Sequence, residues 1–215
     1  MSTKINTRGK HSSKHQQNKK NPIPDYMQSK ISVPIDPKNF LCPKCGARME
    51  YTQACNVYAN DPQNHQWMLI CRKDDIYCKT AKSNAGKVYL KSTPADAKLR
   101  QLRVETHHYF NRLYEDGILP GRDSAYIWLS NKFGFRVIGK LTYRHIGEFD
   151  DFYCKKAISY ILEELLDKAD RLKGPVSLFH SFNDTGYTES TPRFVELVNE
   201  INEKYRASKR TNAED

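Results

Sequence analysis

The sequence contains no long apolar run and none of the common catalytic motifs. No stretch approaches the roughly 20 apolar residues that a membrane-spanning helix needs, and the N-terminus lacks the apolar segment of a secretory signal. A glycine-rich phosphate loop, a Gly-x-Ser-x-Gly elbow and a His-Glu-x-x-His motif are missing as well. These absences predict a cytoplasmic, non-enzymatic protein with no membrane partner and no small-molecule substrate.

Six cysteines are present in this polar chain. In a reducing cytoplasm thiols stay free, so closely spaced cysteines favour a metal over a disulfide. The segment Cys42-Pro43-Lys44-Cys45-Gly46 separates two thiolates by two residues, which is the spacing of half a zinc site. Gly46 permits the positive φ that such a turn often needs, and the turn leaves backbone N–H groups free to bond the thiolates.

The second half of the site is predicted at Cys71 and Cys78, which follow the apolar residues 67–70. Six residues separate this pair, whereas a standard zinc ribbon has two, so Cys55 and His65 remain open as alternative ligands. Four thiolates around one ion form a closed tetrahedral site that is structural, with no open position for chemistry. The expected cofactor is one structural zinc ion. Its predicted ligands are Cys42, Cys45, Cys71 and Cys78.

Positive charge is concentrated in the first part of the chain. Residues 1–38 carry eight Lys or Arg against two Asp, residues 39–91 carry eight against four acids, and residues 92–215 are balanced. This asymmetry predicts a polyanionic partner, either nucleic acid or a ribonucleoprotein; the alternative is a solvated tail that only aids solubility. The predicted contacts are Lys4, Arg8, Lys10, Lys14, Lys19, Lys20, Arg48, Arg72, Lys73, Lys79 and Lys82.

The chain divides into a tail and two modules, and the predicted fold class is α+β. Residues 1–38 have too little apolar surface to order, and are expected to be a disordered basic tail whose end at 31–35 adds an extended segment to the next module. Residues 39–91 alternate short β-rich runs with the cysteines, in the order of a small zinc ribbon. Residues 92–170 predict a small helical domain. Residues 171–215 predict a loop up to residue 190, then an amphipathic helix and a polar tail.

Three helices are expected in the helical domain. The first begins at Pro94 with Thr93 as its N-cap. The second ends at Gly134 and the third follows Gly147, with Cys154 as a small core residue. Residues 135–143, between the second and third helices, are expected to form a short strand pair.

The order of several short signatures resembles a family of zinc-finger-containing domains of unknown function, encoded by phages and prophages of bacteria. The resemblance covers roughly residues 40–165. It rests on Cys42 to Gly46, Val57-Tyr58, Trp67 to Cys71, Cys78, Ala97 to Arg103, His107 or His108, Ala125 to Leu129, and His145 to Asp150 with Cys154. The resemblance implies that the wide Cys71–Cys78 gap is a family trait. It implies no activity, because none is established for the family.

Three classes of function follow from these patterns. The first is a nucleic-acid-binding protein of phage or prophage origin, whose basic tail and ribbon contact phosphates while ribbon tyrosines stack on bases. The second is an adaptor whose neutral helical half docks on a host machine such as RNA polymerase or the ribosome. The third is a metal-dependent nuclease that uses His107, His108 and His145. This last class is disfavoured because the His-His step lies within an amphipathic helix, where packing explains it more simply.

Overall fold

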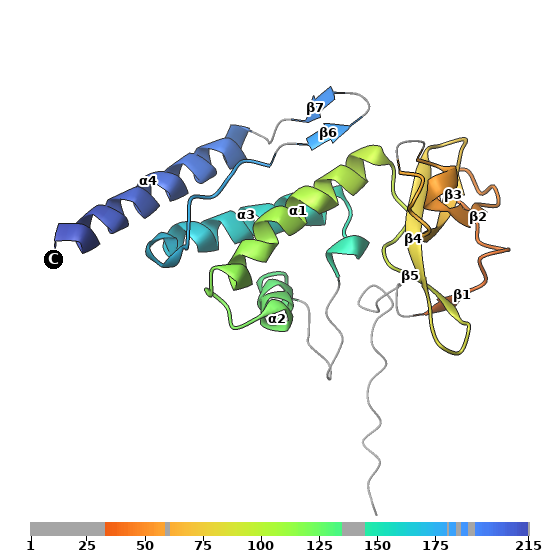
Figure 1. Ribbon diagram of the computed structural model, residues 1–215, viewed down its shortest axis with the longest axis horizontal. Helices are drawn as coiled ribbons and strands as arrows, with labels where there is room; N and C mark the ends of the chain where they lie inside the picture. Colours follow the sequence, from red (N-terminus) through yellow and green to blue (C-terminus); the bar gives the residue numbers. More distant parts are fainter. Residues whose placement is uncertain are drawn as a thin grey trace, which may run out of the picture.

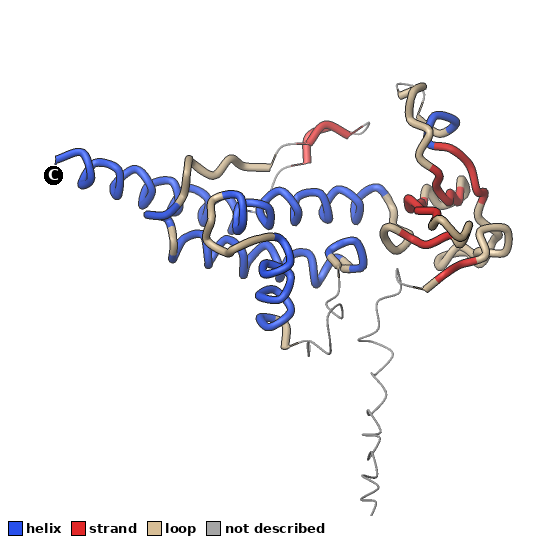
Figure 2. Tube along the Cα trace, turned by 60° about the horizontal axis from the view of Figure 1, so that its bottom comes forward, coloured by secondary structure: helices blue, strands red, loops and turns tan. Residues whose placement is uncertain are grey.

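The computed structural model describes residues 33–58, 61–134, 145–179, 181–183, 186–188 and 192–214. These residues form two parts that lie side by side (Figure 1, Figure 2), a five-stranded antiparallel sheet and a group of helices. The predicted α+β class, with a ribbon followed by a helical part, is confirmed. Most of the predicted tail, residues 1–32, lies outside the described residues. No helix in the described part of the chain is both long and apolar enough to span a bilayer.

The sheet has the strand order β1-β5-β4-β3-β2. Its strands are β1 (Pro34–Ile35), β2 (Glu50–Gln53), β3 (Trp67–Cys71), β4 (Ile76–Lys82) and β5 (Val88–Leu90), and a 3₁₀ turn η3 (Ala54–Asn56) follows β2. β1 pairs with β5, so the segment before residue 39 does add to the sheet, as its alternation predicts. Cys71 at the end of β3 pairs with Ile76 at the start of β4, so residues 72–75 form the turn of a hairpin.

A small core lies on one face of this sheet. Because successive strand residues point to opposite faces, the paired residues Leu69 and Cys78 share a face. The buried cluster on that face consists of Cys42, Met49, Leu69, Cys71, Ile76, Cys78 and Leu90. So small an apolar cluster offers limited burial energy, to which a bound metal ion would add.

The helical part contains α1 (Ala97–Glu115), α2 (Arg122–Lys132), α3 (Asp151–Asp167) and α4 (Pro192–Glu214), with 3₁₀ turns η4 (Ile146–Glu148) and η5 (Ala169–Arg171). α3 packs against both α1 and α4, and α4 extends beyond the other helices at its C-terminal end (Figure 1). The core between them includes the fully buried aromatics Tyr109, Phe110 and Phe149. Cys154 is also fully buried there, which confirms its predicted role as a small core residue.

The start of α1 differs from the prediction. The N-cap is Asp96, whose carboxylate accepts a hydrogen bond from the Leu99 N–H at 2.9 Å. Thr93 instead joins the two parts of the molecule, because its N–H donates to the Gly147 carbonyl at 2.9 Å. Its own carbonyl and hydroxyl oxygens accept from the Arg103 guanidinium. Thr93 is therefore already engaged by tertiary contacts, and the helix begins three residues beyond Pro94 at Ala97.

Two further expectations concern the connecting segments. Residues 171–190, predicted to be a loop, include a short hairpin of β6 (Ser181–Asn183) and β7 (Gly186–Thr188). The strand pair predicted at 135–143 lies outside the described residues. The predicted helix boundaries at Gly134, which has φ +70°, and after Gly147 agree with α2 and α3.

The sheet and the helices are joined by close contacts along β4 and α1. The backbone N–H groups of Tyr77 and Ala95 each donate to the other's carbonyl, at 3.1 and 3.2 Å. The Arg100 guanidinium lies 3.1 Å above the centre of the Tyr77 ring. The buried Arg103 donates to the Phe149 carbonyl at 2.8 Å, which ties α1 to the residue just before α3. These contacts fix the helical part against the sheet.

Candidate functional site

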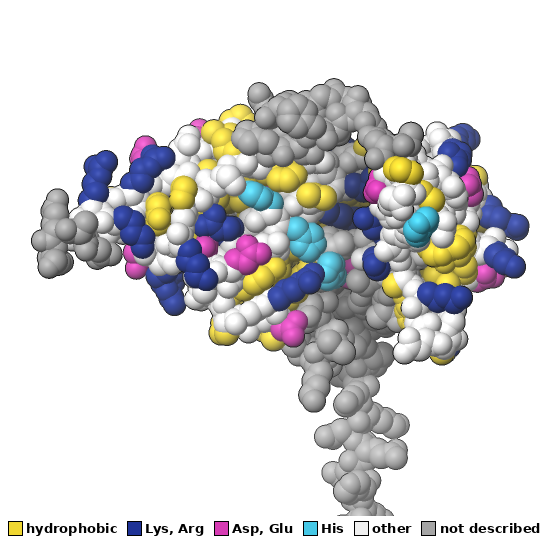
Figure 3. Space-filling view, viewed as in Figure 1, with side chains coloured by type: hydrophobic (Ala, Val, Ile, Leu, Met, Phe, Trp, Pro, Cys, Tyr) yellow, Lys and Arg dark blue, Asp and Glu magenta, His cyan; other side chains and the backbone are white. Residues whose placement is uncertain are grey.

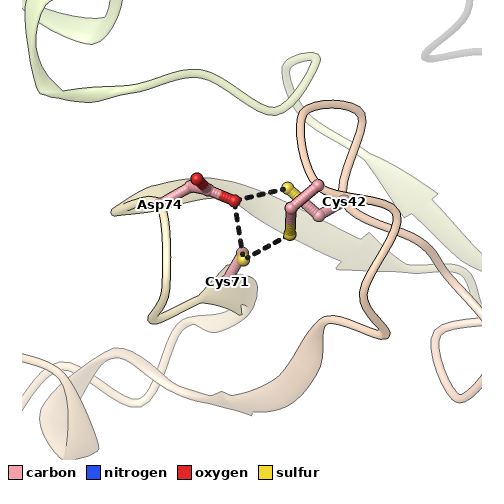
Figure 4. Close-up of side chains that lie close together, drawn as sticks. Cys42, Cys71 and Asp74 are labelled. Carbon is pink, nitrogen blue, oxygen red and sulfur yellow. Dashed lines mark hydrogen bonds between the residues drawn. The ribbon is translucent and has the colours of Figure 1, made fainter.

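Three cysteines and one aspartate meet beside the β3–β4 turn. One ligand atom from each of Cys42, Cys45, Cys71 and Asp74 lies within 4.8 Å of all the others. Asp74 Oδ2 is 3.6 Å from Cys71 Sγ and 3.8 Å from Cys42 Sγ, and the Cys45 and Cys71 sulfurs are 3.6 Å apart. A tetrahedral zinc ion separates its sulfur and oxygen ligands by roughly 3.5–3.8 Å. The cluster therefore has the dimensions of a zinc site, and its side chains point toward one another (Figure 4).

The first two cysteines lie on the tight turn that the sequence predicts. Gly46 has φ +71°, and its N–H donates to the Cys42 carbonyl at 2.9 Å. Burial tends to raise the pKa of Cys42, but hydrogen bonds from the backbone N–H groups of Cys45 and Lys44 outweigh burial, and the pKa is lowered. The turn thus stabilises a thiolate through its backbone, as expected of a metal-binding turn.

The other two ligands come from the end of β3 and the turn that follows it. Cys71 is the last residue of β3, and Asp74 follows it after two residues. Asp75 has φ +49°, an unusual conformation for a residue with a side chain, and it closes the turn so that Asp74 comes back beside the Cys71 thiol. Cys71-Arg72-Lys73-Asp74 therefore repeats the spacing of the first pair, with a carboxylate in place of the second thiolate.

Cys78, the fourth ligand predicted from the sequence, lies outside this group. It pairs with Leu69, two positions along β3 from Cys71, which displaces it by roughly 7 Å along the sheet. It is buried in the ribbon core, and burial raises its pKa to about 12, so it remains a neutral thiol. The structure thus brings together three of the four predicted ligands and adds Asp74.

The two alternative ligands are also outside the group. Cys55 Sγ lies 3.8 Å from Gln53 Oε1, and His65 is exposed. The sequence signal for the fourth member is the Cys-x-x-Asp spacing from Cys71 to Asp74, because a carboxylate can take the place of a cysteine or histidine ligand.

The chemistry of the four groups fits a divalent cation. The Asp74 carboxylate accepts from the Cys45 thiol, which raises the pKa of Cys45 to about 12 and lowers that of Asp74. Four acidic groups this close repel one another when all are ionised, so a proton is retained unless a cation neutralises them. Thiolates are soft ligands that favour zinc over magnesium or calcium. The cluster is accordingly suited to zinc.

A pair of stacked aromatic rings, here called the aromatic platform, lies on the face of the sheet that carries the ribbon core. The rings of Tyr51 and Trp67 have centroids 4.7 Å apart and planes 24° apart, and Trp67 is 44% exposed. Lys91 Nζ donates to Gln66 Oε1 at 2.9 Å, and Gln66 Nε2 donates to the Trp67 carbonyl at 3.0 Å. The platform borders a hollow of about 300 Å³ that Lys82 and Lys91 also line. An exposed indole thus shares this hollow with two lysine side chains.

The cations predicted to contact a polyanion are distributed over the ribbon. Those between residues 4 and 20 lie outside the described residues. Arg48, Lys73, Lys79 and Lys82 are exposed, whereas Arg72 Nε forms an ion pair with Glu50 at 2.8 Å. Tyr58 and Tyr77 contact each other edge to face, with centroids 5.7 Å apart. In the stacked pair Tyr51 is half-buried and Trp67 is exposed, and Trp67 is the functional candidate that sequence reasoning missed.

Two of the histidines considered for a nuclease site, His107 and His108, lie on α1, and the three form no metal cluster among the described residues. The cysteine–aspartate group is the one cluster of three or more His, Cys, Asp or Glu found in the described part of the chain. His145 Nδ1 accepts the Gly147 N–H at 3.0 Å, so in the neutral ring Nε2 carries the proton and has no lone pair for a metal. His107 lies 5.5 Å from His145, ring centre to ring centre, and His108 Nε2 is 3.0 Å from the Ser177 carbonyl. These contacts agree with the packing interpretation of the histidines.

Comparison with known proteins adds one finding. The sequence model of a family described as a zinc-finger-containing domain matches residues 38–164, more than half of the chain. No curated protein and no solved structure matches the sequence. The matched segment contains all four members of the cysteine–aspartate cluster, the aromatic platform, α1 and α2.

Proposed function

This chain belongs to the zinc-finger-containing domain family, and on that premise we propose that it is a non-enzymatic protein that binds single-stranded nucleic acid on a zinc-stabilised sheet. The observation that carries the proposal is the aromatic platform, in which Trp67 is exposed on top of Tyr51 and next to Lys82 and Lys91. Aromatic rings beside lysines combine base stacking with phosphate contacts.

The metal's part in this proposal is structural. One zinc ion held by Cys42, Cys45, Cys71 and Asp74 would be enclosed by four protein ligands, with no position left for a reacting water. It would connect the first cysteine turn to the β3–β4 hairpin, and so fix β3, whose first residue is Trp67. The ion would thereby supply stability that the small ribbon core lacks.

The exposure of Trp67 supports a binding role because it costs stability. A large indole left in water forgoes the burial energy that drives folding, and Trp is enriched where one partner stacks on another. Base–aromatic stacking contributes about 1–3 kcal/mol per base and tolerates any base sequence. The neighbouring ammonium groups add attraction to phosphate that weakens with salt.

We assign this activity to the cytoplasm of a bacterial or phage-infected cell. A site built on three thiolates needs a reducing compartment to keep them from forming disulfides. In the adaptor hypothesis a host protein complex is the partner. The following experiment distinguishes it from the proposed function, because an adaptor would not bind an oligonucleotide.

The test measures fluorescence anisotropy of labelled single-stranded RNA, single-stranded DNA and duplex DNA with the zinc-loaded full chain. Trp67→Ala should weaken single-strand binding about 5- to 150-fold, as expected for a lost stack of about 1–3 kcal/mol. Trp67→Phe should recover most of the affinity, since a ring remains. Phe152→Ala is the matched control, because Phe152 is also an exposed aromatic, 61% exposed, and lies on α3.

Two results would contradict the proposal. One is a zinc-loaded protein that binds no single strand, and the other is Trp67→Ala binding as tightly as the wild type. The chain has two tryptophans, so a Trp128→Phe background leaves Trp67 as the sole indole. In that background, binding should quench the fluorescence.

A further inference from the structure

A groove of about 980 Å³ lies between the sheet and α1. It adjoins the hollow at the aromatic platform along β4: Tyr77, Cys78 and Lys79 line the groove, and Thr80, Ala81 and Lys82 line the hollow. In Figure 3, lysine, arginine and histidine side chains gather around the junction between the ribbon and the helical part. The volume is at the upper end of the roughly 300–1,000 Å³ of pockets that hold small ligands.

Two hydrogen-bond donors in the groove have no acceptor among the described residues. Gln101 Nε2 is buried without a partner there, which is costly for a polar group unless a ligand or water satisfies it. The other donor is Nε2–H of His145, whose Nδ1 is occupied by the Gly147 N–H. Both residues line the groove. A ligand that is rich in acceptor atoms would provide a hydrogen-bond partner for both donors.

The charged groups that line the groove are mainly cationic. Lys79 is exposed and forms no ion pair with a described residue, and Lys91 Nζ bonds the neutral Gln66 amide. Arg100 lies 3.6 Å from the Asp75 carboxylate, which offsets part of its charge. Asp61 is the other acid in the lining, and Arg103 is a further cation. The surplus of cations and free donors favours an anionic ligand that accepts hydrogen bonds.

We propose that this groove binds a nucleotide unit of a single nucleic-acid strand, with the phosphate at Lys79 and the base acceptors at Gln101 and His145. The inference rests on the proposed function, since the same strand would also stack on the aromatic platform. An acidic peptide also offers acceptors, but the rings of Tyr58 and His107 in the lining are flat walls that suit a base. A free mononucleotide shares the same chemistry, and the experiment distinguishes it from a strand.

The test follows the groove directly by NMR of the zinc-loaded full chain. The side-chain amide signals of Gln101 and the imidazole signals of His145 are recorded during titration with a ten-nucleotide single strand, with a mononucleotide, and with a ten-residue glutamate peptide. The strand should shift both sets of signals. The mononucleotide should shift them only at concentrations at least tenfold higher, and the peptide should leave them in place.

Two variants remove groove contacts, with a matched control. Lys79→Ala should weaken strand binding about 3- to 10-fold and lower the slope of log affinity against log salt by about 1. Gln101→Met, which keeps the length but loses the donor, should weaken it about 5-fold or more. Lys87→Ala removes a lysine that is also exposed, in the turn before β5 and outside the groove lining, and should change affinity less than twofold.

The outcomes separate this inference from the proposed function. If the strand quenches Trp67 while the Gln101 and His145 signals do not move, the groove inference is overturned and the proposed function stands. If no strand binds at all, both fail. Binding of the glutamate peptide as tightly as the strand, or of the mononucleotide as tightly as the strand, would also overturn the inference.

Discussion

Replacing Asp74 with asparagine tests which residue completes the metal site. The substitution keeps the side-chain size but removes the negative charge of a group whose oxygen lies 3.6 Å from Cys71 Sγ and 3.8 Å from Cys42 Sγ. Residues that only orient a metal ligand contribute about 10- to 100-fold to metal affinity. A direct ligand should therefore contribute more than about 100-fold, which corresponds to about 2.7 kcal/mol. The matched control is Cys78→Ala, which removes the thiol expected from the sequence but found outside the cluster.

The two variants should behave differently in a zinc competition assay with a chromophoric chelator. Asp74→Asn should lose zinc affinity, and its thermal stability should fall below that of the wild type only when zinc is present. Cys78→Ala should keep wild-type zinc affinity while losing about 1–2 kcal/mol of unfolding free energy, because it leaves a small cavity in the ribbon core.

Cobalt substitution gives an independent count of the sulfur ligands, because the thiolate-to-cobalt charge-transfer band grows with the number of thiolates. The band should be equal in the wild type, Asp74→Asn and Cys78→Ala, and should fall by a third in Cys71→Ser. The reasoning would be refuted if the band of Cys78→Ala were a quarter weaker than that of the wild type and Asp74→Asn bound zinc with normal affinity. Those two results together would restore the four-cysteine site.

Two further predictions concern the helical part. Arg103→Met removes the hydrogen bonds to the Phe149 carbonyl and to the Thr93 carbonyl and hydroxyl, so the unfolding free energy in urea should fall by about 3 kcal/mol with zinc affinity unchanged; an unaltered midpoint would contradict the assigned role. Burial, and then the charges of His145 and Arg122, lowers the pKa of His107 from 6.5 to about 4. Below pH 6.5 the unfolded chain therefore takes up a proton on this ring, whereas the folded protein keeps the ring neutral. The unfolding free energy is highest above pH 6.5 and falls by up to about 3 kcal/mol as the pH drops toward 4. In His107→Gln this part of the pH dependence should disappear, and an identical acid profile for the two proteins would count against it.

The parts of the site that depend on local spacing were predictable from the sequence. The turn from Cys42 to Gly46 is one, because two thiolates and a glycine with positive φ define its geometry within five residues. The class of the fold followed for the same reason, since strand-like and helix-like periodicity change over near residue 92. The alternation in residues 31–35 also predicted that an extended segment adds to the ribbon, although its partner strand, β5, was not predicted.

The features that depend on register and on distant contacts were not predictable in this way. Whether Asp74 or Cys78 reaches the cluster depends on where the hairpin turns, and that is set by the left-handed conformation of Asp75 and the pairing of Cys71 with Ile76. The start of α1 was misplaced because Thr93 is occupied by Gly147, which lies far along the chain. The exposure of Trp67 was missed since a Trp-led apolar strand predicts a buried ring.

Lys91 lines both the hollow at the aromatic platform and the groove beside α1. One lysine side chain thus marks where the two sites adjoin. Under the proposals made above, an oligonucleotide too short to reach from one site to the other gains the affinity of a single site. A longer one, once held at one site, meets the other at a high effective concentration, so length rather than base sequence would set how tightly it is retained.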